Sequence, residues 1–136
     1  MLIFPTDISV DNTLRQRFID SNTWAWSDGP INSLNVSVLD TSSAGLSACF
    51  YRGPIENLDE KALNGTIANT GMRLFVATSE TSFAQYAWRT GLAQWTYETE
   101  WNDVNALASP ACMGWGAGQM MHVAFVDLDN MVSVYW

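Results

Sequence analysis

The stretch MMHVAFVDLDNMVSVYW, residues 120–136, sets the pattern for the whole chain. It contains two short runs, 121–127 and 131–136, in which Val, Phe, Tyr and Trp dominate, as is typical of half-buried strands. The joint between the runs carries Asp129 and Asn130, and both residue types tolerate the backbone geometry of a tight turn. The stretch therefore predicts a β-hairpin.

Three further stretches follow the same design. The predicted hairpins join residues 2–4 to 13–19, residues 33–40 to 44–51, and residues 72–78 to 82–88. The first of them turns at Asp11 and Asn12, which again suit a tight turn. We therefore expect an all-β chain built of antiparallel hairpins.

The segments between these hairpins are shorter and less regular. Further strands are expected over residues 23–26, 93–99 and 106–115. Residues 56–64 predict one helical turn, with Gly65 following as a C-terminal glycine, and an irregular edge strand is the alternative.

Composition bounds the functional classes. A chain of 136 residues with 48% hydrophobic and 15% charged residues predicts one globular domain. Seven Trp residues call for a role in packing or binding. The net charge of −8, with Lys61 as the single lysine, argues against binding to nucleic acid or to an anionic membrane. No apolar run is long enough for a transmembrane helix.

The sequence offers little evidence for metal or redox chemistry. One His and two Cys do not match zinc spacing, so no metal and no cofactor is expected. Cys49 and Cys112 are interpreted as buried free thiols. The N-terminus lacks the basic region of a secretory signal, so we expect a cytoplasmic protein or one released without a classical signal. On that ground the sequons at Asn35 and Asn64 are taken as chance.

Matching strand positions recur at Asn35, Arg73 and His122, which are 38 and 49 residues apart. Repeats of this length, each made of several strands, are typical of β-propeller blades. An ordinary antiparallel sandwich is the alternative. The pattern favours a β-propeller of four-stranded antiparallel blades, incomplete in one chain, with residues 1–136 forming a single domain of about three and a half blades.

Three stretches resemble the fungal fucose-specific lectin family, whose fold is a six-bladed propeller. These stretches are DNTLRQRFIDSNTWAW (residues 11–26), MRLFVATSETSFAQYAWRTGLAQW (residues 72–95) and SPACMGWGAGQMMHVAFVDLDNMVSVYW (residues 109–136). In that family an Arg and a Glu of one blade bind the sugar hydroxyls, and aromatic residues of the next blade cover its apolar face. The resemblance implies sugar sites between adjacent blades.

Only parts of that motif occur here. The positions of the family's Arg hold Phe4, Asn35, Arg73 and His122, and those of its Glu hold Gln16, Ala48, Gln85 and Val134. The sugar-binding residues that the resemblance implies are Arg73, Gln85, Trp136, Trp88, Trp95 and Asn35. The first three would form the best site, and the last three a weaker one. An ion pair for Arg73 and packing roles for the tryptophans remain the alternatives.

The resemblance implies a lectin-like protein that binds fucose or a related neutral monosaccharide. Because a carboxylate is missing at Gln85, binding should be modest, and Gln85→Glu should strengthen it. The alternative is a pathway enzyme of the cycloaddition type that holds an apolar small molecule in a propeller pocket. Either way, an incomplete ring predicts a homo-oligomer or a pairing with another chain.

Overall fold

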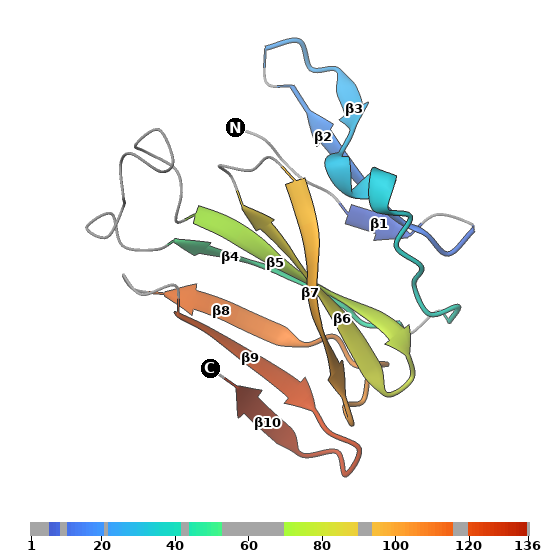
Figure 1. Cartoon of the computed structure of the whole chain (residues 1–136), viewed down its shortest axis with the longest axis vertical. Coiled ribbons are helices and arrows are strands. Elements are labelled where there is room, and N and C mark those ends of the chain that lie inside the picture. Colours follow the sequence, from blue (N-terminus) through green and yellow to red (C-terminus); the bar gives the residue numbers. More distant parts are fainter. Residues whose placement is uncertain are drawn as a thin grey trace.

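The computed structural model describes residues 6–8, 11–20, 22–41, 44–52, 70–89, 94–115 and 120–135. Over these residues the protein is all-β, with ten antiparallel strands and one short 3-10 helix (Figure 1). The expected fold class is confirmed at this level. The strands form three separate sheets, and within the described residues none of them closes on itself.

The first sheet contains β1 (Thr6–Ile8), β2 (Leu14–Ile19) and β3 (Trp26–Asp28), in that order. The β1–β2 connection includes Asn12, whose φ of 57° is in the left-handed region. Asp11 supports this turn, since its carboxylate accepts a hydrogen bond from the Thr13 hydroxyl at 2.6 Å. The turn expected at Asp11 and Asn12 is therefore present.

The second sheet has four strands in sequence order. They are β4 (Leu46–Arg52), β5 (Thr70–Ser79), β6 (Ser82–Arg89) and β7 (Gln94–Asn102). The third sheet has β8 (Ala111–Trp115), β9 (Met120–Val126) and β10 (Val132–Tyr135) in the order β10-β9-β8. The β5–β6 and β9–β10 pairings confirm the hairpins predicted for residues 72–88 and 120–136.

The hairpin predicted from residues 33–40 and 44–51 is wrong. Pro30–Leu34 form the 3-10 helix η1, and β4 pairs with β5 instead. Proline at the start of η1 favours this short helix, and Asn35 ends it with a φ of 47°. Val36 and Val38 alternate with exposed residues because they pack into the core, and Ser37 makes a single bridge to Thr13.

The strand expected over residues 106–115 is shorter than predicted, because β8 begins at Ala111. Ala106 instead accepts a hydrogen bond from the Gly45 backbone N–H, 2.8 Å long, in the connection before β8. The predicted strand 2–4, the predicted helical turn 56–64 and Trp136 lie outside the described residues. No described helix is long and apolar enough to cross a membrane.

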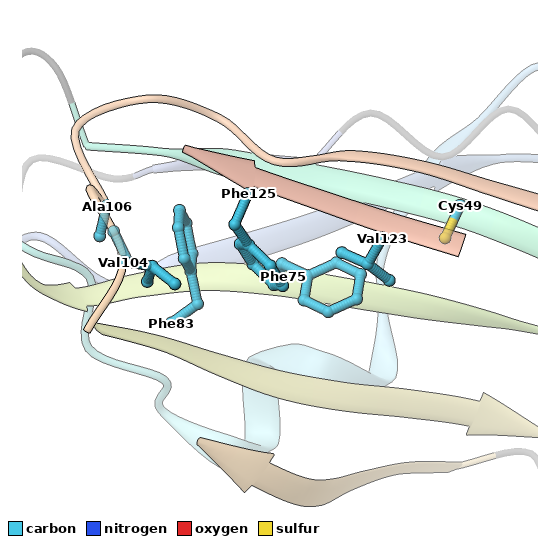
Figure 2. Close-up of a cluster of buried hydrophobic side chains, with 8 residues drawn as sticks. Cys49, Phe75, Phe83, Val104, Ala106, Val123 and Phe125 are labelled. Carbon is cyan, nitrogen blue, oxygen red and sulfur yellow. The ribbon is translucent and has the colours of Figure 1, made fainter. Parts of the chain in front are cut away.

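Two buried clusters join the three sheets. One lies between the first and second sheets and includes Leu14, Ile31, Val36, Leu74, Val76 and Trp95. The other lies between the second and third sheets and includes Phe75, Phe83, Val104, Val123 and Phe125 (Figure 2). Because side chains alternate along a strand, β5 sends successive residues to the two clusters, so the second sheet is buried on both faces.

Aromatic rings fill the second cluster. Phe125 of β9 meets Phe75 edge to face with centroids 5.8 Å apart, and it lies 5.6 Å from the Phe83 ring. Such contacts add to the free energy gained by burying the rings.

A disulfide between Cys49 of β4 and Cys112 of β8 joins the second and third sheets. The two Cα atoms are 5.7 Å apart, within the usual range for a disulfide. The interpretation of both residues as free thiols is therefore wrong. Their separation of 63 positions hid the pairing, since only the packing of β4 beside β8 brings them together.

Candidate functional site

Arg73 and Gln85 come from the two central strands of the second sheet. Arg73 lies on β5 opposite Ala87, and Gln85 lies on β6 opposite Phe75. Both side chains belong to the sheet face that carries Phe75, which is the face directed at the third sheet. The pair expected from the sequence therefore shares one face.

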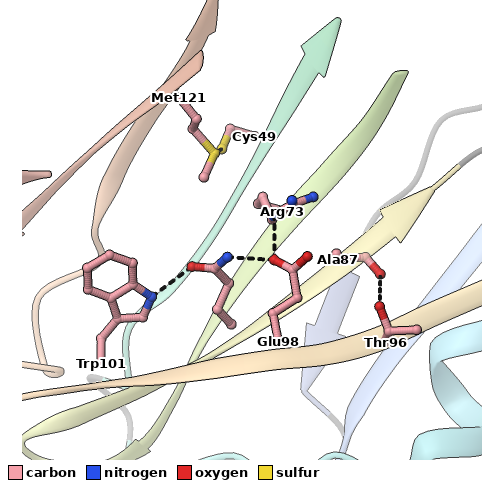
Figure 3. A network of polar contacts seen from close by, with 8 residues as sticks. Cys49, Arg73, Ala87, Thr96, Glu98, Trp101 and Met121 are labelled. Carbon is pink, nitrogen blue, oxygen red and sulfur yellow. Dashed lines mark hydrogen bonds and ion pairs between the residues drawn. The ribbon is translucent and has the colours of Figure 1, made fainter. Parts of the chain in front are cut away.

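Glu98 of β7 connects these two residues. Its Oε2 atom lies 2.7 Å from Arg73 Nε and accepts a 2.7 Å hydrogen bond from Gln85 Nε2 (Figure 3). On its other side, Gln85 Oε1 accepts a 2.7 Å hydrogen bond from the indole Nε1–H of Trp101. The four residues Arg73, Glu98, Gln85 and Trp101 form one continuous polar chain, which we call the Arg73–Trp101 network.

A β-bulge explains how Glu98 and Trp101 come to share this face. In the β6–β7 pairing Gln85 lies opposite Thr99 and Tyr86 lies opposite Tyr97, so Glu98 is an extra residue without a partner. Tyr97 shares the face of Tyr86, so alternation turns Glu98 to the face of Gln85, and the extra residue brings Trp101, opposite Phe83, to that face as well. Glu98 is therefore not a simply solvated carboxylate, because it pairs with Arg73.

The network is shielded from solvent but not closed. The side chains of Arg73 and Glu98 are 17% and 22% exposed, and Gln85 is 8% exposed. A charge-assisted pair in such surroundings is stronger than a fully solvated one. The alternative role for Arg73, pairing with an acidic neighbour, is what the structure contains.

Aromatic residues of the third sheet border the network. The Trp101 ring lies 5.0 Å from the Phe125 ring and 5.1 Å from the Tyr135 ring, centroid to centroid. Tyr135 is 45% exposed, so part of its ring faces solvent beside Trp101. Donors, acceptors and an accessible aromatic ring thus meet between two sheets.

The second implied site has a different environment. Trp95 is 7% exposed, and its indole N–H donates a 3.1 Å hydrogen bond to Gln16 of the first sheet. Trp88 lies beside it, with ring centroids 5.7 Å apart. Asn35 is exposed at the end of η1. The structure thus gives Trp95 a packing contact between sheets.

The remaining candidates are scattered. His122 lies on β9 opposite Met113 and is partly buried. Trp136, expected to complete the best site, lies outside the described residues. Within the part of the chain that the structure describes, no group of His, Cys, Asp and Glu could hold a metal ion.

An open depression of about 240 Å³ lies on the first sheet and is lined by Arg17, Trp26, Ser27 and Asp28. Arg17 and Asp28 are directly opposite each other on β2 and β3. This volume is below the range of pockets that enclose drug-sized ligands.

Sequence reasoning missed Glu98, Trp101 and Tyr135. The carboxylate was present in the alternating run of β7, but the bulge that brings Trp101 to the same face leaves no mark in the sequence. No protein-family model matches the chain, and no curated protein is significantly similar to it.

Proposed function

We propose that this protein binds a neutral monosaccharide, fucose or a close relative, and that its three sheets are successive blades of a β-propeller. The observation that carries this proposal is the Arg73–Trp101 network, with Tyr135 beside it. It combines the chemical groups that a sugar site needs in a partly exposed place between two sheets.

Each group has a plausible part in sugar recognition. Sugar hydroxyls both donate and accept hydrogen bonds, so they pair with the Arg73 guanidinium and with the Glu98 carboxylate. The C–H face of a pyranose is apolar and packs against an aromatic ring, for which Tyr135 is 45% exposed. Glu98 supplies a carboxylate beside Gln85, which holds the position where the lectin resemblance implies a Glu.

The arrangement of the sheets supports the propeller part of the proposal. The sheets follow one another in chain order, and each is antiparallel. The first strands of the second and third sheets lie side by side and are joined by the disulfide, as expected for strands near a common axis.

Titration calorimetry with L-fucose, galactose and mannose tests the function. We expect millimolar or tighter binding of one sugar, and loss of at least ten-fold in affinity in Glu98→Gln, because the amide removes the charged acceptor. Glu80→Gln is the matched control, since Glu80 is exposed in the β5–β6 turn.

The outcome that contradicts the proposal is the absence of binding by any of these sugars at millimolar concentration. Equal affinities in Glu98→Gln and wild type would contradict the site. If calorimetry detects binding of an apolar small molecule and no binding of the sugars, the pocket-enzyme alternative is favoured.

A further inference from the structure

The outward face of the third sheet is apolar. Met113, Val132 and Val134 are 62%, 67% and 47% exposed there. The strand pairing sets Val132 opposite Val126, and Val134 opposite Ala124, so small and apolar residues lie side by side. A sheet face that remains in water normally carries polar residues, and a continuous apolar face indicates an interaction surface.

The equivalent face of the second sheet is covered. There Phe75 pairs with Gln85 on the face directed at the third sheet, and Phe75 is completely buried. The pair that occupies this place in the third sheet is Ala124 with Val134. Each sheet of the chain thus turns a face toward the sheet that follows it, and for the third sheet this face is exposed.

The first sheet carries the complementary surface. At the junction of the first and second sheets, Trp95 reaches Gln16 of the preceding sheet. Trp95 pairs with Trp88, which is three positions after Gln85. Trp26 pairs with Ile19, which is three positions after Gln16. Trp26 is therefore the equivalent of Trp95 by strand register.

The exposure of the two tryptophans differs sharply. Trp95 is 7% exposed because the first sheet covers it, whereas Trp26 is 55% exposed. Trp26 also lines the depression beside Arg17 and Asp28. The outward face of the first sheet therefore presents an aromatic anchor with a polar rim, which is typical of a protein interface.

We propose that the outward face of the third sheet docks on the outward face of the first sheet of a second copy of this chain. Trp26 of one copy packs against Val134 of the other copy. Within its sheet Val134 occupies the position equivalent to that of Gln16, the residue that Trp95 contacts. The chain carries both halves of this contact, which is why a second copy is the occupant. The contact continues the stacking already present between its own sheets.

The charges are compatible with this contact. The described outward residues of the third sheet are Ala111, Met113, His122, Ala124, Val126, Val132 and Val134, and they include no carboxylate. Docking therefore brings no acidic side chain of this face against Asp28, although the chain has a net charge of −8. The aliphatic stem of Arg17 can cover apolar surface while its charge stays in water.

Because different faces meet, the contact is head-to-tail, and such contacts close into rings or continue into filaments. Light scattering coupled to size-exclusion chromatography measures the result. We expect wild type to elute as a finite multiple of 15.1 kDa, and both Trp26→Asp and Val134→Asp to elute as monomers. Trp24→Asp and Leu128→Asp are the controls, since these exposed residues lie in turns, and they should keep the mass of wild type.

Mixing the two monomeric variants tests the pairing of the faces. Trp26→Asp retains an intact third-sheet face, and Val134→Asp retains an intact first-sheet face, so an equimolar mixture should form a two-chain species. The double variant should remain monomeric in the same experiment. Dissociation by Val134→Asp but not by Trp26→Asp would show that two third sheets meet, and would overturn the proposal, as would a monomeric wild type.

Cross-linking gives a readout that does not depend on disrupting the contact. Trp26→Cys and Val134→Cys are made separately, mixed and treated with a short bismaleimide. We expect a cross-linked dimer of the two variants, because Cys49 and Cys112 are already oxidised and do not react. Near-ultraviolet circular dichroism confirms that every variant is folded, and a failure of the mixed, folded variants to cross-link would contradict the docking.

Discussion

Gln85 is held by hydrogen bonds on both sides of its amide. Its nitrogen donates to Glu98, and its oxygen accepts from Trp101. The sequence alone predicted that Gln85→Glu would strengthen sugar binding by supplying a carboxylate. The contact with Glu98 leads us to predict the opposite, because the new carboxylate would lie against Glu98 in place of a donor.

We therefore predict that Gln85→Glu lowers the free energy of unfolding by about 1–3 kcal/mol, the usual cost of losing a hydrogen bond to a charged group. It should also weaken any sugar binding. Urea denaturation at neutral pH measures the change, with Gln94→Glu at an exposed position of β7 as the control. A variant as stable as wild type would mean that the Gln85–Glu98 contact contributes nothing.

Tyr86 gives a prediction about pH. Burial raises the pKa of Tyr86 above its ordinary value, and the negative charges of ionised Tyr97 and of Glu100 raise it further. Between the unfolded pKa of about 10 and the higher folded pKa, the unfolded chain loses this proton while the native chain keeps it. The contribution to stability is thus complete below pH 10 and is lost as the pH rises through the folded value.

We predict that the free energy of unfolding of wild type falls more steeply above pH 10 than that of Tyr86→Phe, which cannot ionise at this position. Denaturant titrations at a series of pH values from 8 to above 10 measure both slopes. At pH 8 the variant sets the baseline, since the side chain at position 86 is uncharged in both proteins there. Parallel pH profiles would show that Tyr86 ionises equally easily in both states.

At the scale of single elements, Asp residues organise the turns. Asp127 Oδ1 accepts hydrogen bonds from the backbone N–H groups of Asp129 and Met131, at 3.0 and 2.8 Å. Asp20 does the same for Asn22 and Thr23 before β3. In the β9–β10 turn this support accompanies Asn130, whose φ of 60° only a few residue types accept easily.

We predict that Asp127→Ala destabilises the protein by about 1–3 kcal/mol, because two turn N–H groups lose their acceptor. Asp127→Asn retains an oxygen at the same place and should cost clearly less. Thermal and urea denaturation of the two variants make the comparison. Equal losses in both would indicate that the negative charge matters, and that the hydrogen bonds to the turn do not.

At the scale of the whole molecule, the disulfide fixes the third sheet to the second. Cys49 and Cys112 close a loop of the chain across 63 positions, and a cross-link of this length restricts the unfolded state strongly. Disulfides generally form and persist in oxidising compartments. In such a compartment the sequons at Asn35 and Asn64, interpreted as chance from the sequence, become candidate glycosylation sites.

We predict that replacing both cysteines by Ser lowers the free energy of unfolding by about 2–5 kcal/mol. Titration with a thiol reagent under native conditions should find no reactive thiol in wild type. Reduced wild type should match the double variant in denaturation. Unchanged stability after reduction would contradict the structural role of this bond.

The amino-acid pattern was sufficient to predict local structure where the neighbouring strand follows at once in the chain. The hairpins β5–β6 and β9–β10 are examples, since alternating β-branched and aromatic residues flank short turns rich in Asp, Asn, Ser and Thr. The same pattern misled over residues 33–40. There Val36 and Val38 alternate because they enter the core, and the segment makes only a single bridge, from Ser37 to Thr13, in place of the predicted hairpin.

Local sequence therefore determined the fold class, the hairpins β5–β6 and β9–β10, and the presence of Arg73 and Gln85 on one face. Tertiary structure decided which segments far apart in the chain meet. It paired Cys49 with Cys112, brought Trp101 to the face of Glu98 through a bulge, and set Trp101 against the rings of the third sheet. These contacts depend on how sheets pack and where a strand gains one residue, and neither is encoded in the periodicity of a single segment.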